Sequence, residues 1–226
     1  MTFSIAGFCP ESNQLGIAIT TSSIAVGSRC PWVRPGVGAV SSQNITLPSI
    51  GNMILDRLEA GDNAPEALAS VMNDMRYKDY RQVIAIDSKG KTSFYSGEFT
   101  LGTNGVSSGT NCIAAGNLLK SRELPAVMVK TFEGSSSVGL AERLLRSLES
   151  GLYEGGGEMG ATHSASLLVA GKESWPLVDL RVDWNEVDPV KELRELWIAY
   201  EPQMMDYIIR ANDPEKAPSF GVPGDE

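Results

Sequence analysis

The chain opens with MTFSIAGFCPESNQLGIAITT, residues 1–21, and this stretch decides the fold. Residues 2–8 and 15–21 are rich in the aromatic and β-branched side chains that favour strands. Between them lies the segment 10–14, PESNQ, whose residues favour turns. The N-terminus is therefore predicted to form a hairpin of two β-strands.

Groups of strands and helices follow this hairpin. A third strand is expected at 36–40, where small residues allow close approach of another backbone or a ligand. Apolar spacing and turn residues predict the remaining elements. They are helices at 50–61 and 64–75, strands at 80–87, 91–95 and 111–115, helices at 124–132 and 138–152, strands at 164–170 and 177–183, and a helix at 189–200 that resumes after Pro202.

Short turns join most neighbouring strands in this order, which favours antiparallel pairing and the α+β class. Two antiparallel sheets packed face to face, with helices on both outer faces, would bury every apolar stripe. The sequence thus predicts a four-layer αββα sandwich, built as one domain over residues 1–211. Residues 212–226 are rich in Pro, Gly and charge, and are expected to form a loose tail or an arm on a neighbouring subunit.

Composition narrows the classes of function. The 226 residues are 42% hydrophobic and 21% charged, as in ordinary globular proteins, and the net charge of -9 disfavours nucleic acid and membranes as partners. No bilayer-spanning apolar run and no signal peptide is apparent, so a cytoplasmic location is expected. The three cysteines form no C-x-x-C pair, so neither a disulfide framework nor a zinc site is expected. No cofactor is expected, and the expected partners are a small molecule and further copies of the chain.

Thr2 suggests a mechanism, provided that Met1 is removed. One residue would then carry a hydroxyl nucleophile and an α-amine base. Because an α-amine has a pKa of about 8, it could accept the hydroxyl proton near neutral pH without a histidine. The alternative is that Thr2 is an ordinary residue of the first strand, since Met-Thr is a common start.

Several motifs across residues 1–200 carry a resemblance to a known family. They are Met1-Thr2-Phe3-Ser4-Ile5, Ala25-Val26-Gly27, Pro31-Trp32, Gly36-Val37-Gly38-Ala39-Val40 with Gln43, Pro48-Ser49, Arg81-Gln82, Gly116-Asn117, Ser164-Ala165 and Leu180-Arg181-Val182-Asp183. With them the chain resembles the family called domain of unknown function 1028. The resemblance implies the fold of the N-terminal nucleophile (Ntn) hydrolases, and implies no particular reaction. The chain departs from the family pattern at Ser22, Ala115 and Thr162-His163, so its substrate preference, or even its activity, could differ from that of its relatives.

An amide-cleaving Ntn site also needs oxyanion donors and polar groups that hold the substrate. Ser22 and Ser23 end the second predicted strand, and Ser42 and Gln43 follow the third, so all four could lie beside Thr2. Each could equally be a turn or edge residue.

Three further candidates come from later strands. Gly116 and Asn117 could offer a backbone amide and a side-chain amide to an oxyanion, or could form an ordinary turn. Arg81 could hold a substrate carboxylate through its guanidinium fork, or could form an ion pair with Asp179 or Asp183.

His163 is the single histidine, so a Ser-His-Asp triad would depend on it, and a structural role is the favoured interpretation. Glu154 and Glu158 flank the glycine loop at 155–157, where carboxylates are usually solvated.

Three hypotheses remain. The first is an Ntn-type amidohydrolase that cleaves the amide of a small polar metabolite with Thr2. The second is a non-catalytic protein of the same fold that binds a small molecule or assembles with partners. The third is hydrolysis by an internal serine, among Ser22, Ser23 and Ser42, aided by His163.

Overall fold

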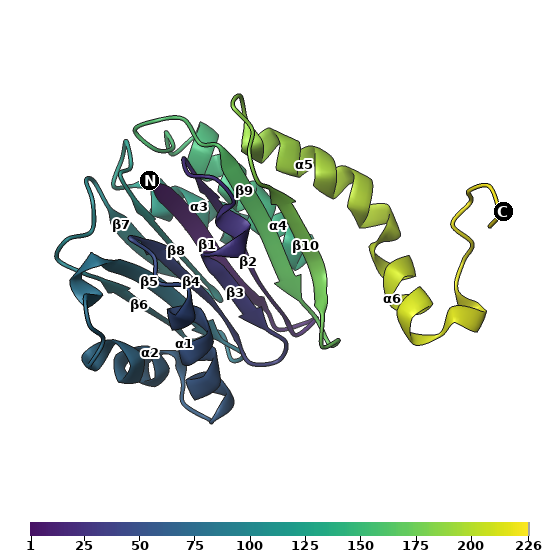
Figure 1. Ribbon diagram of the computed structural model, residues 1–226, viewed down its shortest axis with the longest axis horizontal. Helices are drawn as coiled ribbons and strands as arrows, with labels where there is room; N and C mark the ends of the chain where they lie inside the picture. Colours follow the sequence, from purple (N-terminus) through teal and green to yellow (C-terminus); the bar gives the residue numbers. More distant parts are fainter. Residues whose placement is uncertain (226) are drawn as a thin grey trace.

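Two antiparallel sheets form the centre of the computed structural model, which describes residues 1–225 (Figure 1). The first sheet has the strand order β10-β9-β2-β1-β8-β7. Its strands are β1 (Thr2–Cys9), β2 (Gln14–Thr21), β7 (Gly105–Gly109), β8 (Cys112–Asn117), β9 (Ser164–Ala170) and β10 (Pro176–Val182). The predicted hairpin, β1 and β2, lies in the middle of this sheet, so β1 has a paired strand on each side.

The second sheet has the strand order β3-β4-β5-β6. Its strands are β3 (Pro31–Arg34), β4 (Gly38–Asn44), β5 (Arg81–Asp87) and β6 (Thr92–Ser96). A buried apolar layer that includes Ile17, Ile19, Ile84 and Ile86 separates the two sheets. Because strand residues alternate between faces, one face of each sheet supplies this layer.

Helices cover both outer faces. On the second sheet lie α1 (Ser49–Glu59) and α2 (Ala64–Asn73), and on the first sheet lie α3 (Leu124–Gly134), α4 (Leu140–Tyr153) and α5 (Pro189–Tyr200). Asn63 and Glu66 form a capping box at the start of α2, and the Asp188 carboxylate caps α5, which explains where these helices begin. The predicted α+β, four-layer αββα sandwich is confirmed.

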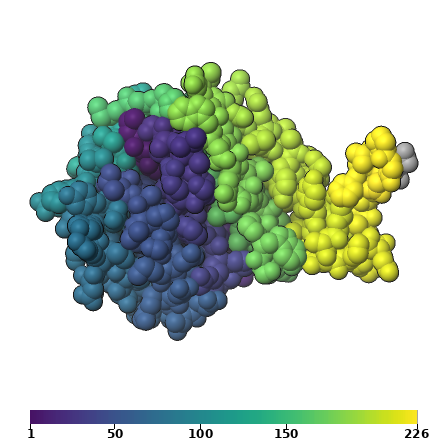
Figure 2. All heavy atoms as spheres, viewed as in Figure 1, coloured from purple at the N-terminus to yellow at the C-terminus, as the bar shows by residue number. Residues whose placement is uncertain are grey.

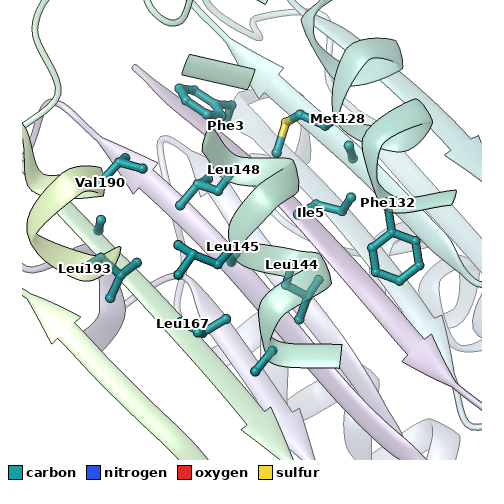
Figure 3. Packing of buried hydrophobic residues seen from close by; sticks show 14 of the residues in the cluster. Phe3, Ile5, Met128, Phe132, Leu144, Leu145, Leu148, Leu167, Val190 and Leu193 are labelled. Carbon is teal, nitrogen blue, oxygen red and sulfur yellow. The ribbon is translucent and has the colours of Figure 1, made fainter. Parts of the chain in front are cut away.

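The core under α4 fixes the direction of the side chains on β1. Leu144, Leu145 and Leu148 form the predicted apolar stripe and pack with Phe3 and Ile5 (Figure 3). These five side chains are fully buried. Because Phe3 and Ile5 face the helices, the even-numbered residues of β1 face the other sheet.

The strand predictions missed β3 and β7 and misplaced β4. β3 has four residues, and β7, GVSSG, has little apolar character, so neither gives a clear strand pattern. The third strand was predicted at 36–40, whereas β4 runs from Gly38 to Asn44, because Gly36 has φ 68° in the turn before it. The polar residues 41–44 continue the strand because their backbone pairs with β5, and Ser41 and Gln43 also contact Ser4 of the other sheet.

The C-terminal segment leaves the sandwich. The 3₁₀ turn Glu201–Gln203, helix α6 (Met204–Asn212) and the 3₁₀ turn Pro214–Lys216 follow α5, and no residue of α6 is buried. This segment, yellow in Figure 2, projects from the body of the molecule. The division into a domain of residues 1–211 and a tail stays a prediction. None of the helices in the described chain has the length and apolar character needed to cross a bilayer.

Candidate functional site

The layer between the two sheets changes from apolar to polar where β1 begins. Along β1, Ala6 and Phe8 lie in the apolar layer, whereas Thr2 and Ser4 occupy the same face at the start of the strand. The polar residues gathered at this end are Thr2, Ser4, Thr21 and Asn117 from the first sheet, and Ser41, Gln43 and Gln82 from the second. All of them are buried. Polar groups are costly to bury without partners, so this end of the sandwich is the candidate site.

Three side-chain amides connect the two sheets. The Ser4 hydroxyl donates to Gln43 Oε1 at 2.7 Å, and Gln43 Nε2 donates to Gln82 Oε1 at 2.8 Å. Asn117 Nδ2 donates to the same Gln82 oxygen at 3.1 Å. Gln82 Nε2 donates to the Gly116 carbonyl oxygen at 3.1 Å. Within the described chain Asn117 Oδ1 is buried without a partner, so this network ends in an available acceptor.

Two threonine hydroxyls converge beside this network. Thr2 and Thr21 are opposite each other in the β1–β2 register, and their Oγ1 atoms lie 3.0 Å apart. The Thr2 hydroxyl donates to the Met1 carbonyl oxygen at 2.6 Å, and the Thr21 hydroxyl donates to the same oxygen. The Thr2 and Thr21 hydroxyls can therefore both donate to an oxygen atom at this position.

Glu158 approaches the N-terminus from the loop after α4. A β-bridge between Leu119 and Glu158 holds this loop against the chain that follows β8. The Glu158 side chain is buried, with 1% of its surface exposed, and in the described chain neither carboxylate oxygen has a hydrogen-bond partner. Burial raises the pKa of Glu158 to about 8, although the N-terminal amine and the Ser22 backbone amide act at longer range to lower it.

An open hollow adjoins this carboxylate. Its volume is about 490 Å³, and its lining includes Lys120, Tyr153, Glu158, Gly160 and Asp188. The side chain of Met1 lies beside one lining residue, because a Cβ added at Gly160 would be only 2.8 Å from the Met1 methyl carbon. Figure 2 shows the N-terminal atoms, in purple, at the molecular surface, so this end of the sandwich is reachable from solvent.

The structure brings some of the predicted site residues to Thr2 and places others elsewhere. Gln43, Gly116 and Asn117 belong to the amide network, while Ser22 and Ser23 follow Thr21 directly. Ser22 directs its backbone amide toward Glu158. Ser23 is exposed, and its hydroxyl accepts a hydrogen bond from Arg29 at 3.0 Å.

Ser42 and Arg81 lie on the opposite faces of their strands from Gln43 and Gln82. The Ser42 hydroxyl donates to the Leu47 carbonyl oxygen at 3.2 Å. The Arg81 guanidinium donates to the Ile45 carbonyl oxygen instead of pairing with Asp179, which holds Arg181 at 2.7 Å. Neither side chain is directed toward Thr2.

His163 has the structural role that the sequence favoured. Its ring stacks on Trp184 with centroids 4.5 Å apart, and its Nδ1 lies 3.2 Å from the Asn185 carbonyl oxygen. The described structure shows no hydrogen bond between this ring and a serine. The hypothesis of an internal serine aided by His163 therefore finds no geometric support.

Sequence reasoning missed Thr21, Ser4, Gln82 and Glu158. The hairpin register places Thr21 opposite Thr2, and strand alternation places Ser4 on the same face as Thr2. Both residues could therefore have been predicted from the sequence. The motif Arg81-Gln82 contained Gln82, but only the observed start of β5 decides which of the two faces inward. The expectation that Glu158 is solvated was wrong, because the β-bridge to Leu119 draws its loop into the fold.

Among the described residues, no three His, Cys, Asp or Glu side chains are placed to hold a metal ion. The cysteines are free thiols, and burial raises the pKa of Cys30 to about 11 and of Cys112 to about 12. These two thiols stay protonated at neutral pH and are poor nucleophiles.

The fold and the site define a four-layer αββα protein with a buried polar site at the first residues of its central strand. A family model described as "Family of unknown function (DUF1028)" matches residues 2–193. The chain therefore belongs to this family, as the sequence motifs predicted. No curated protein matches the chain.

The solved structures that resemble the chain include the following two. A crystal structure of a protein of the same family from Silicibacter pomeroyi has 28% sequence identity and a TM-score of 0.81, and the match covers 88% of each chain. Anbu, the ancestral beta-subunit from Yersinia bercovieri, has 11% identity and a TM-score of 0.42, over 90% of this chain and 96% of that one.

Proposed function

We propose that this chain is an Ntn-type amidohydrolase that cleaves the C–N amide bond of a small polar metabolite. Thr2 supplies the nucleophile after Met1 has been removed. We also propose that the protein works as a cytoplasmic homo-oligomer built from the domain of residues 1–211. The observation that carries the proposal is the placement of the Thr2 hydroxyl. It is buried between the sheets, 3.0 Å from a second hydroxyl and one residue from the amino end of the described chain.

The chemistry needs no group beyond the chain and water. The Thr2 hydroxyl oxygen attacks the substrate carbonyl carbon, and its proton passes to the Thr2 α-amine. The C–N bond then breaks, and the departing amine takes this proton. Water hydrolyses the ester left on Thr2, which releases the acid and restores the hydroxyl. The proton taken up by the α-amine leaves with the departing amine, and the two hydrogens of the water end on the released acid and on the Thr2 hydroxyl.

The neighbouring residues suit this reaction. The Thr21 hydroxyl, which donates to the Met1 carbonyl oxygen, is the candidate donor to the oxyanion that forms during attack. Asn117 Nδ2 is engaged with Gln82, so Asn117 offers its free Oδ1 as an acceptor for a substrate N–H. Gln43 and Gln82 hold Asn117 in place, and Ser22 and Ser23 lie at the rim of the site.

Intact mass and kinetics test the proposal. The untagged protein should lack one methionine, and wild type should hydrolyse at least one member of a panel of small amides. Thr2→Ala should abolish this hydrolysis, while Thr2→Ser should keep part of it because the hydroxyl is retained. Thr110→Ala, at an exposed threonine on a turn, is the matched control and should behave as wild type. Retention of Met1, or no turnover by wild type, would favour the non-catalytic binding protein. Turnover by Thr2→Ala would exclude Thr2 as the nucleophile.

A further inference from the structure

Met1 shows what the space beside Thr2 accommodates. Its carbonyl oxygen accepts hydrogen bonds from the Thr2 and Thr21 hydroxyls. Its amine lies near enough to the Glu158 carboxylate to act on it electrostatically. Its methyl group lies against Gly160, at the hollow. An α-aminoacyl group therefore has a place for its carbonyl, its amine and its side chain.

Glu158 is buried although it is an ionisable residue in a loop. Charged groups taken out of water are normally paired, because their desolvation is otherwise not offset. Within the described chain neither oxygen of this carboxylate has a hydrogen-bond partner, although the residue lines the hollow. Without a partner this carboxyl favours its protonated form, and a cation with N–H donors is the complement that would stabilise the ionised carboxylate there.

The other charged residues of the hollow do not take this role. The Asp188 carboxylate accepts a hydrogen bond from the Tyr153 hydroxyl at 2.7 Å, and it also caps α5. Lys120 is exposed and repels a cation rather than binding one. Glu158 remains as the group that can hold an ammonium next to Thr2.

We propose that the space vacated by Met1 binds the aminoacyl part of the substrate, with its ammonium on Glu158 and its carbonyl oxygen between the Thr2 and Thr21 hydroxyls. The substrate class is then an amide of an α-amino acid whose amino group is free. The inference rests on the proposed function, in which Met1 leaves and Thr2 attacks. An acetylated amino group has no charge and is larger, so it loses the contact to Glu158.

Binding to a variant without the nucleophile tests the subsite. Thr2→Ala, shown by intact mass to lack Met1, is titrated calorimetrically with L-methionine amide and with N-acetyl-L-methionine amide. The free amine should bind about tenfold or more tightly than its acetylated counterpart, as expected for a desolvated charge pair. Adding Glu158→Gln to this variant should bring the ratio of the two dissociation constants close to one. Adding Glu154→Gln instead, at an exposed carboxylate of the same loop, should leave that ratio unchanged. Equal binding of the two probes, or no binding of either, would overturn the subsite.

Hydrolysis of the same two amides separates this inference from the proposed function. Wild type should prefer the free amine, and Glu158→Gln should lose this preference mainly through KM. Selective binding of the free amine without turnover would contradict the amidohydrolase and support the aminoacyl subsite. Turnover of acetylated and free amides at equal rates would keep the amidohydrolase and remove the subsite. Circular dichroism and thermal unfolding of each variant confirm that the comparison is made on folded protein.

Discussion

Gln43 and Gln82 are opposite each other on neighbouring strands, and a 2.8 Å hydrogen bond joins their side-chain amides. This pair lies beside the start of β1, where Gln43 accepts a hydrogen bond from Ser4. Gln82 also accepts from Asn117 and donates to the Gly116 carbonyl oxygen. One side chain thus satisfies partners in both sheets, and its loss leaves several buried groups without a partner.

Gln82→Ala should lower the free energy of unfolding by about 2–4 kcal/mol, since it leaves unsatisfied buried polar groups and a small cavity. Urea or thermal unfolding measures this change. Gln203→Ala, at an exposed glutamine, is the control and should change stability by less than about 0.5 kcal/mol. Equal stability of the two variants would show that the network does not hold the sheets together.

Thr21→Val should lower kcat by about tenfold or more on any amide that wild type hydrolyses, because it removes a hydroxyl donor without changing the shape of the side chain. KM should change much less. Thr21→Ser should restore most of the rate, because it returns the hydroxyl. An unchanged kcat in Thr21→Val would exclude this hydroxyl as the oxyanion donor.

Glu158 should make stability depend on pH. Burial raises its pKa from 4.5 to about 8, so between these values the folded chain binds more protons than the unfolded chain. Its contribution to stability is therefore complete below pH 4.5 and is lost as the pH rises to about 8. Glu158→Gln should unfold at a higher temperature than wild type, by a margin that grows across this window.

Thermal unfolding at several pH values measures this difference, which should rise by at most about 1.4 kcal/mol per pH unit. Glu154→Gln is the control for the loop and should follow wild type at every pH. A constant difference between Glu158→Gln and wild type from pH 5 to 8 would contradict a buried, titrating carboxyl.

A chain ending at residue 211 should fold with a thermal midpoint within a few degrees of the full chain, because none of the described residues that it loses, 212–225, is buried. Light scattering compares the masses of the two proteins. The exposed Phe220 and Val222 lie in the removed segment, so a fall in mass would place this arm at the expected contact between copies. A large loss of stability with unchanged mass would show that the tail belongs to the domain.

The fold could be predicted from the sequence because its apolar patterns are local. The Leu144 to Leu148 stripe and the alternation around Phe3 and Ile5 each identify the face that is buried. The candidate site is less predictable, since it joins residues that are far apart in the chain. Thr21 follows from the hairpin register, whereas the pairing of Gln43 with Gln82 depends on the exact start of β5. No local pattern shows that Glu158 is buried, because a β-bridge to Leu119 causes it.

The central place of β1 has a consequence for the timing of synthesis. β1 is made first, but its partner β8 ends at Asn117 and leaves the ribosome much later. At translation rates of about 5–20 residues per second, the first strand waits roughly 5–20 seconds for this neighbour. During this interval β1 can pair with β2, but its other edge has no partner strand. We therefore expect the proposed removal of Met1 to precede the pairing of Thr2 with Asn117, which completes the candidate site.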